Sequence, residues 1–359
     1  MYANARRPAA ALAALMLLAG APAFAAADAP APAPAAVQQR QEARDAAIRA
    51  AVDRHALPGF ARFAEAAAAL DAAARADCAP DAPALRAAWG AAFDAWLAVS
   101  HLRFGPTEAG HRAFALAFWP DAKGFTPRTL GKLLKAPEGA DPLADPAAFA
   151  ESSIAGRGFY AMERLMFDKD VSAAPPERAC ALVRAQAADI ARIAAELDAA
   201  WRATRGPMLI AHDGGDYPAA EDAARELYKA LDAGLQFIAD VRLGRPLGTL
   251  DRPRPMRAEA HRSGRAQHNV EAALAALDEL HAALSGPLGG APRTASAFAR
   301  ARKAAAELND PSFAKVTEPM GRFRLEALQT AVEDARAAAA EEIGKGLGVS
   351  AGFNALDGD

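Results

Sequence analysis

Apolar side chains recur every three or four residues along nearly the whole chain after residue 37. Ile190, Ile193 and Leu197 belong to one such stripe, and Leu277 and Leu280 belong to another. This spacing places the apolar side chains on one face of an α-helix, which must be buried against other helices. No segment shows a convincing alternation with a period of two. The sequence therefore predicts an all-α protein.

The same spacing predicts where the helices lie and how they group. The expected helices cover residues 38–76 with a break at Pro58–Gly59, 82–103, 146–168 with a break at its glycines, 177–204, 218–243, 257–285, 293–308 and 321–344. Helix-breaking Gly206–Pro207, Gly214–Gly215 and Pro218 separate the first four helices from the last four. We therefore predict two packed four-helix-bundle-like domains, residues 38–204 and 205–359, the second with a tail that folds back onto it.

The N-terminus has the features of an export signal. Arg6 and Arg7 precede an apolar run, and Ala23-Phe24-Ala25 gives a small-residue cleavage pattern. We expect residues 1–25 to be a signal peptide and residues 26–37, rich in Pro and Ala, to be an extended linker. Because neither cysteine of the chain lies near the cleavage point, the sequence predicts a soluble periplasmic protein rather than a lipoprotein.

Charge and cysteine content narrow the functional classes. Loss of the two signal-peptide arginines changes the formal net charge from −3 to −5, which argues against a nucleic-acid partner. Cys78 and Cys180 are the only cysteines, and export to an oxidising compartment predicts a disulfide between them. A bridge that closes so long a loop stabilises a protein by roughly 4–5 kcal/mol in the chain-entropy model. Two free buried thiols are the alternative.

The segment GRGFYAMERLMF, residues 156–167, combines two glycines with a carboxylate inside an apolar run. Tyr160 and Glu163 are three residues apart and therefore share one face of a helix. We expect the glycines to allow two backbones to approach, or to direct the Tyr160–Glu163 turn at a cavity. Glu163 should then face either an arginine partner or a bound cation.

A second candidate region is WLAVSHLRFGPTEAGHRAFALAFWPD, residues 96–121. Glu108, His111 and Arg112 lie within about one helical turn of each other. Glu108 could contribute to a site, or it could simply pair with Arg103 or Arg112. Elsewhere, the polar neighbours of His261 and His268 suggest an exposed surface, and no HExxH zinc-protease motif occurs.

Four motifs in this order resemble the imelysin-like family of exported bacterial proteins. They are W-L-x-x-x-x-L-R-F-G-P-T-E at 96–108, F-W-P-D at 118–121, G-x-Y-x-x-E at 158–163 followed by R-L-M-F, and G-F-N-A-L-D-G-D at the C-terminus. The resemblance spans most of the chain beyond the signal. It implies two packed helical bundles with a candidate site near their interface.

The resemblance also implies a site with one departure from the family pattern. The hallmark is G-x-H-x-x-E; Gly158 and Glu163 match it, but Tyr160 stands at the position of the histidine. A phenol titrates near ~10 and suits Fe(III) better than zinc. The implied metal ligands are Glu108, Tyr160 and Glu163, and the supporting residues are His111, Arg112, Asp121 and Gly158.

The sequence leaves three functions open. The favoured one is a binding or accessory protein for iron acquisition, with iron or another divalent or trivalent metal, or a haem-related ligand, as its partner. Such a protein would work with other periplasmic or membrane components of iron uptake. The alternatives are a metal-dependent peptidase, as the family name implies, and a noncatalytic structural or interaction protein on a degenerate site. No catalytic residue is assigned.

Overall fold

The computed structural model describes residues 34–135, 139, 141–168, 171, 175–210 and 215–349. The predicted signal peptide, residues 26–33 of the predicted linker and residues 350–359 of the predicted folded-back tail lie outside this part of the chain. Every regular element in the described ranges is a helix, and those ranges contain no strand. The all-α prediction is confirmed.

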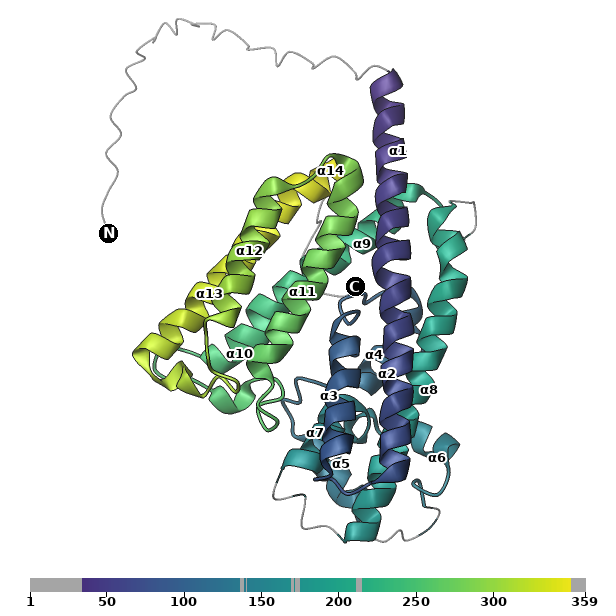
Figure 1. The fold of residues 1–359 in the computed structure, drawn as a ribbon, viewed down its shortest axis with the longest axis vertical. Coiled ribbons are helices and arrows are strands. Elements are labelled where there is room, and N and C mark those ends of the chain that lie inside the picture. The colour runs from purple at the N-terminus through teal and green to yellow at the C-terminus, as the bar shows by residue number, and fades with distance from the viewer. Residues whose placement is uncertain are drawn as a thin grey trace, which may run out of the picture.

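The first elements form one long column, seen on the right of Figure 1. It consists of α1 (Pro34–Ala51), the π-helical segment η1 (Val52–Ala56) and α2 (Leu57–Ala76). The linker prediction was wrong at its end, because α1 begins at Pro34 and residues 34–37 are helical. The break expected at Pro58–Gly59 is a π turn just before Pro58 that leaves the helix continuous. Such a wider turn suits the position, because proline has no N–H for the usual helical hydrogen bond.

Around α2, the first group of helices buries an aromatic core. Here α2 packs against α3 (Pro83–Leu97) and α8 (Pro176–Leu209), and α7 (Gly158–Phe167) packs against α8. Phe60 stacks on Trp201 with ring centroids 5.0 Å apart, and Phe93 stacks on Phe159 at 4.8 Å. The short elements of this group are η2 (Gly105–Thr107), η3 (Ala109–His111), α4 (Arg112–Leu116), α5 (Phe125–Leu133), α6 (Pro146–Ala150) and η4 (Ile154–Gly156).

The second group lies beside the first, on the left of Figure 1. In it, α12 packs against α11 and α13, and α9 packs against the same two helices. The elements are α9 (Ala220–Gln236), η5 (Phe237–Leu243), α10 (Gly244–Leu247), η6 (Pro255–Arg257), α11 (Ala266–Ser285), η7 (Gly286–Leu288), α12 (Pro292–Ala306), η8 (Ala314–Thr317), α13 (Pro319–Ala339), η9 (Ala340–Gly344) and α14 (Lys345–Leu347). Of these, η5 and η9 are π-helical.

The helix α1 connects the two groups. It continues into α2 of the first group, yet it packs against α9, α11 and η7 of the second. At the other connection, α8 runs through Gly206 and Pro207 to Leu209 rather than ending at 204. The division into domains at residues 204 and 205 stays a prediction.

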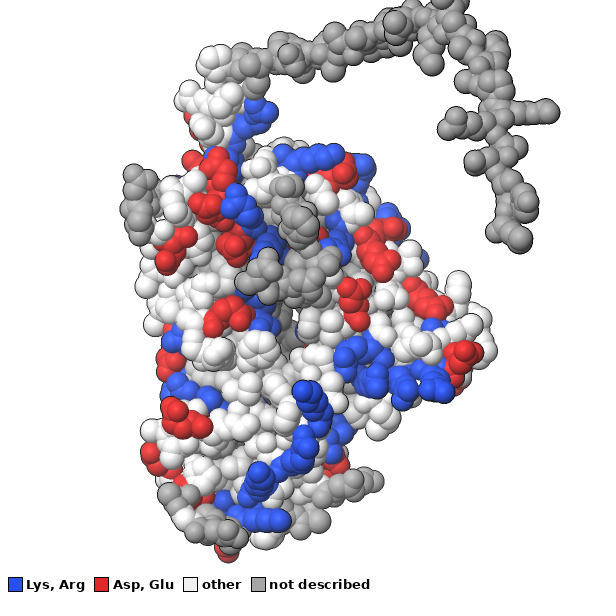
Figure 2. All heavy atoms as spheres, turned by 180° about the vertical axis from the view of Figure 1, so that it is seen from behind, with Lys and Arg blue, Asp and Glu red and all other residues white. Residues whose placement is uncertain are grey.

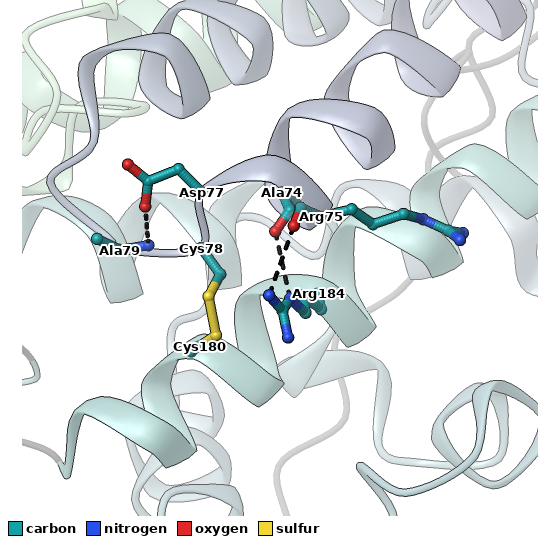
Figure 3. The surroundings of a disulfide bond; sticks show 7 residues. All are labelled: Ala74, Arg75, Asp77, Cys78, Ala79, Cys180 and Arg184. Atoms are coloured by element: carbon teal, nitrogen blue, oxygen red, sulfur yellow. Dashed lines mark hydrogen bonds between the residues drawn. A yellow bond between two sulfur atoms is a disulfide. The ribbon is translucent and has the colours of Figure 1, made fainter.

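A disulfide joins the end of α2 to α8, as predicted. Cys78 and Cys180 are bonded, with their Cα atoms 4.8 Å apart (Figure 3). Close by, the Arg184 guanidinium donates hydrogen bonds to the carbonyl oxygens of Ala74 and Arg75 at 3.4 and 3.5 Å. These bonds satisfy two carbonyls that the last turn of α2 leaves without a helical partner.

One predicted helix is shorter than its apolar spacing suggested. The segment 257–285 is helical in α11 only from Ala266 onward, and residues 258–265 form an irregular connection. Ala260 and Gly264 have positive φ angles of 45° and 69° there, which a continuous helix does not allow. Separately, within the described ranges we find no helix long and apolar enough to span a membrane.

Candidate functional site

The start of α7 requires glycine for two reasons. Gly158 has a φ of 73°, and a Cβ atom there would lie 2.2 Å from the carbonyl oxygen of Leu116. At Gly156 a Cβ atom would lie 2.8 Å from side-chain atoms of Leu133 and of Thr129. The glycines therefore let neighbouring segments approach closely, as the sequence suggested, and they set the direction in which α7 begins.

Tyr160 points from α7 to a carboxylate of the second group of helices. Its hydroxyl donates a short hydrogen bond to Oε1 of Glu259, whose other oxygen accepts one from Arg242 Nε at 2.7 Å. Glu259 and Arg242 are 1% and 6% exposed, so the ion pair is buried. Burial, followed by the charge of Glu259, raises the pKa of Tyr160 well above its usual 10. Tyr160 is therefore a neutral phenol that acts as a donor.

Glu163 has neither of the partners expected from the sequence. Its Oε1 accepts hydrogen bonds from the backbone N–H and the hydroxyl of Ser263, each at 2.9 Å. Burial raises the pKa of this carboxyl group, while the Ser263 bonds and the nearby charge of Arg262 oppose that rise. The residue is 3% exposed. Glu163 thus binds to the irregular connection before α11 rather than to an arginine.

Tyr160 and Glu163 line a partly open cavity of about 180 Å³. We call it the Tyr160 cavity; it lies where α7 and residues 118–127 of the first group meet α10 and residues 256–262 of the second. Its lining is rich in basic side chains. On the face seen in Figure 2, Lys and Arg form a band across the lower half, whereas basic and acidic side chains are mixed on the upper half. The charged and titratable lining residues are Asp121, Glu163, Arg164, Arg245, Arg257, His261 and Arg262, beside Tyr160.

Of the other predicted site residues, only Asp121 lines the Tyr160 cavity. Its two oxygens accept hydrogen bonds from the backbone N–H groups of Phe125 and Thr126 at 2.9 and 2.7 Å, which caps α5. Although burial opposes ionisation, these bonds lower the pKa of Asp121. The Asp121 carboxylate is therefore committed to the backbone.

Glu108, His111 and Arg112 lie elsewhere. Glu108 forms a short ion pair with Arg103 and is not part of the cavity lining. This matches the alternative in which Glu108 pairs with a neighbouring arginine, rather than the hypothesis that it is a metal ligand. Arg112 pairs with Glu196 at 3.3 Å, and its guanidinium also donates to the carbonyl of Pro106. His111 is exposed. The structure does not bring the three predicted metal ligands to one place.

The donor set of the Tyr160 cavity does not suit a bare metal ion. Tyr160 donates its proton to Glu259, both Glu259 oxygens have partners, and one Glu163 oxygen accepts two hydrogen bonds. Four arginines line the same space and would repel a cation. Across the described ranges, no group of three or more His, Cys, Asp or Glu side chains could hold a metal ion.

Sequence reasoning missed the side chains that complete this site. Arg242, Glu259 and Ser263 lie 75 to 96 positions after the end of α7, and the last two lie in the connection 258–265, for which the sequence predicts helix. His261 was taken for a surface residue, yet it lines the cavity and its Nε2 is buried. One sequence feature could have indicated the irregular connection. Residues 257–265 are mostly polar, whereas a packed helix would show an apolar face.

Comparisons with known proteins identify the family and the fold. The model of the imelysin family matches residues 56–339. An imelysin-like protein from Psychrobacter arcticum 273-4 superposes with a TM-score of 0.72 at 18% identity, covering 87% of this chain and 98% of that one. A proposed iron-regulated protein A precursor from Parabacteroides distasonis ATCC 8503 superposes with a TM-score of 0.61 at 13% identity, covering 83% and 95%.

At these identities the two solved structures show the fold alone. No curated protein matches the chain significantly. The family match is independent of the structures and covers well over half of the sequence. The chain therefore belongs to the imelysin family.

Proposed function

We propose that this protein is an exported, noncatalytic binding protein with an accessory role in iron acquisition, and that it binds its ligand in the Tyr160 cavity. The observation that carries the proposal is the cavity itself. It lies at the junction of the two helical groups and is lined by Tyr160 and Glu163 of the motif that resembles the family hallmark. The similarity to a protein described as iron-regulated supports the link to iron. Periplasmic location follows from the predicted signal peptide.

The size of the cavity restricts the ligand. Sites for drug-sized molecules typically enclose roughly 300–1,000 Å³, and the Tyr160 cavity encloses about 180 Å³. A haem macrocycle would not fit without rearrangement of the surrounding helices. We therefore favour a small ligand over haem.

A gene-deletion strain of the source bacterium tests the iron-related role. We expect the strain to grow more slowly than the wild type when an iron chelator is added, and to recover when the wild-type gene is restored. Restoration with Glu163→Gln should recover growth only in part, because this change alters the cavity wall. Glu108→Gln is the matched control, since Glu108 pairs with Arg103 away from the cavity and its loss should not affect growth.

Two results would contradict the proposal. Equal growth of deletion and wild-type strains under iron limitation would remove the role in iron acquisition. The purified wild type could instead cleave a denatured protein in the presence of zinc, with this activity lost in Glu163→Gln. That result would show that the protein is a peptidase rather than a binding protein.

A further inference from the structure

Two of the four arginines that line the Tyr160 cavity have no acidic partner among the described residues. Among the described residues, Arg164 and Arg262 both pair with Asp168, at 3.1 and 2.9 Å. Neither Arg245 nor Arg257 forms an ion pair or a side-chain hydrogen bond within the described part of the chain. Both line the cavity. Two positive charges with no acidic partner in the described ranges thus lie beside one partly open cavity.

Arg245 is the more buried of the two and is held in place. Its guanidinium lies 5.9 Å from the centroid of the Trp119 ring, and its Nε is shielded from solvent with no acceptor in the described structure. Burial and the charge of Arg257 lower the pKa of Arg245. A buried donor without an acceptor and a repulsive like charge both cost free energy. An anion bound between the two guanidinium groups would offset both costs.

His261, which also lines the cavity, offers one hydrogen-bond acceptor. The carbonyl oxygen of Ala258 lies 3.1 Å from His261 Nδ1 and can only accept, so Nδ1 carries the proton. The buried Nε2 of His261 then has a free lone pair and no partner among the described residues. Burial, followed by the charge of Arg262, lowers the pKa of His261, which keeps the ring neutral. A ligand that accepts from the two arginines and also donates one hydrogen bond would suit His261 as well.

We propose that Arg245 and Arg257 bind a small oxyanion, carrying a carboxylate or a phosphate group, in the Tyr160 cavity. The inference rests on the proposed function, since it names the ligand class of the same site. The proposed ligand has few heavy atoms, because the cavity encloses about 180 Å³. Monohydrogen phosphate and hydroxycarboxylates have the required chemistry, because each combines anionic oxygens with one O–H donor for His261.

Calorimetric titration of the purified mature protein tests this, with inorganic phosphate and citrate as separate probes. The buffer is free of iron, and sodium chloride keeps the ionic strength constant, so that general screening does not contribute. We expect saturable binding of at least one probe to the wild type. Binding of phosphate alone identifies a phosphate group as the natural anion, and binding of citrate alone identifies a carboxylate.

Matched arginine variants show whether the cavity is the site. We expect Arg245→Gln and Arg257→Gln each to weaken binding at least tenfold. Arg252→Gln makes the same charge change at an exposed position between α10 and η6, outside the cavity lining, and should leave affinity within twofold. Because neither Arg245 nor Arg257 forms an ion pair with a described residue, their replacement should not lower the melting temperature, which a thermal scan checks.

Absence of saturable binding to the wild type, or equal weakening by Arg252→Gln, would overturn the inference. Such a failure would leave the growth test of the iron-related role untouched. Conversely, the protein could bind an anion while the deletion strain grows normally under iron limitation. That result would refute the role in iron acquisition but support the proposed ligand class.

Discussion

Gly158 is the residue at which the backbone of the site is most constrained. Its φ is 73°, and a Cβ atom would lie 2.2 Å from the Leu116 carbonyl oxygen. We therefore expect Gly158→Ala to lower the free energy of unfolding by more than about 2 kcal/mol, since backbone strain and overpacking add together. Urea denaturation followed by circular dichroism measures the change.

Gly206→Ala provides the control. Gly206 lies within α8, and a Cβ atom there would meet nothing within 4 Å. Alanine is a better helix former than glycine by up to about 1 kcal/mol, so this variant should be unchanged or slightly stabilised. Equal losses in both variants would show that the close approach at Gly158 is not what requires glycine there.

Tyr160 donates to a carboxylate that is almost fully buried. Tyr160→Phe would leave Glu259 Oε1 without its donor, while Arg242 would still hold the other oxygen. We expect a loss of about 1–3 kcal/mol in the free energy of unfolding, the typical cost of an unsatisfied buried acceptor. Tyr217→Phe is the comparison, because the Tyr217 hydroxyl has no partner within the described ranges and its removal should cost less. Equal effects of the two changes would contradict the Tyr160–Glu259 bond.

At single positions, the sequence predicted best those features that depend on local spacing or on the number of residues of one type. The shared helix face of Tyr160 and Glu163 follows from a separation of three residues, and the Cys78–Cys180 bridge follows from there being only two cysteines. The partners of both α7 side chains could not be predicted, because Glu259 and Ser263 lie about 100 residues away. Nothing in local spacing states which distant loop will meet a helix.

At the scale of elements, long helices were predictable and short ones were not. Apolar residues repeat over many turns in segments such as α8 and α13, so their period is unambiguous. In contrast, α4 and α5 have five and nine residues, too few for the period to show. The connection 258–265 lies inside the predicted helix 257–285, and its positive φ angles have no clear sequence signature apart from Gly264.

Glu342 of η9 caps a neighbouring helix. Its carboxylate accepts hydrogen bonds from the backbone N–H groups of Arg293 and Thr294 at the start of α12, and from the Thr294 hydroxyl. Although burial opposes ionisation, these bonds lower the pKa of Glu342 to about 2. We expect Glu342→Gln to lower the free energy of unfolding at pH 7 by about 1–2 kcal/mol.

The pH dependence of that difference follows from the lowered pKa. A carboxylate that titrates at lower pH in the folded state stabilises the protein fully above its unfolded pKa of about 4.5. The stabilisation is lost as the pH falls from there toward 2. The gap between wild type and Glu342→Gln should therefore close over this range in urea titrations. Glu341→Gln is the control, because Glu341 is exposed and its one ion pair in the described ranges is with Lys345, so the change should have little effect at any pH.

At the scale of the whole molecule, two buried histidines lie where the column formed by α1, η1 and α2 meets α11. The Nε2 atoms of His55 and His101 are 2.9 Å apart, and His55 Nδ1 lies 3.7 Å from a carboxylate oxygen of Glu279 on α11. His55 and His101 are 2% and 8% exposed. The sequence placed both in helical segments but could not show that they would meet, because they are 46 positions apart. Their contact depends on the π-helical segment η1, which contains His55 and sets the direction of its side chain.

This pair makes the stability of the assembled fold depend on pH. Burial first, then the charges of His55 and Arg242, lower the pKa of His101 well below its usual 6.5. Below pH 6.5 the unfolded chain therefore binds a proton that the folded one does not, so stability is complete above that pH and falls beneath it. The free energy of unfolding should decrease by at most about 1.4 kcal/mol per pH unit from this group.

Urea denaturation between pH 8 and 5.5 measures the slope of the free energy of unfolding against pH. His101→Gln should flatten this slope, and His111→Gln, at an exposed position, should leave it unchanged. An unaltered slope in His101→Gln would mean that the acid sensitivity of the fold arises outside this histidine pair.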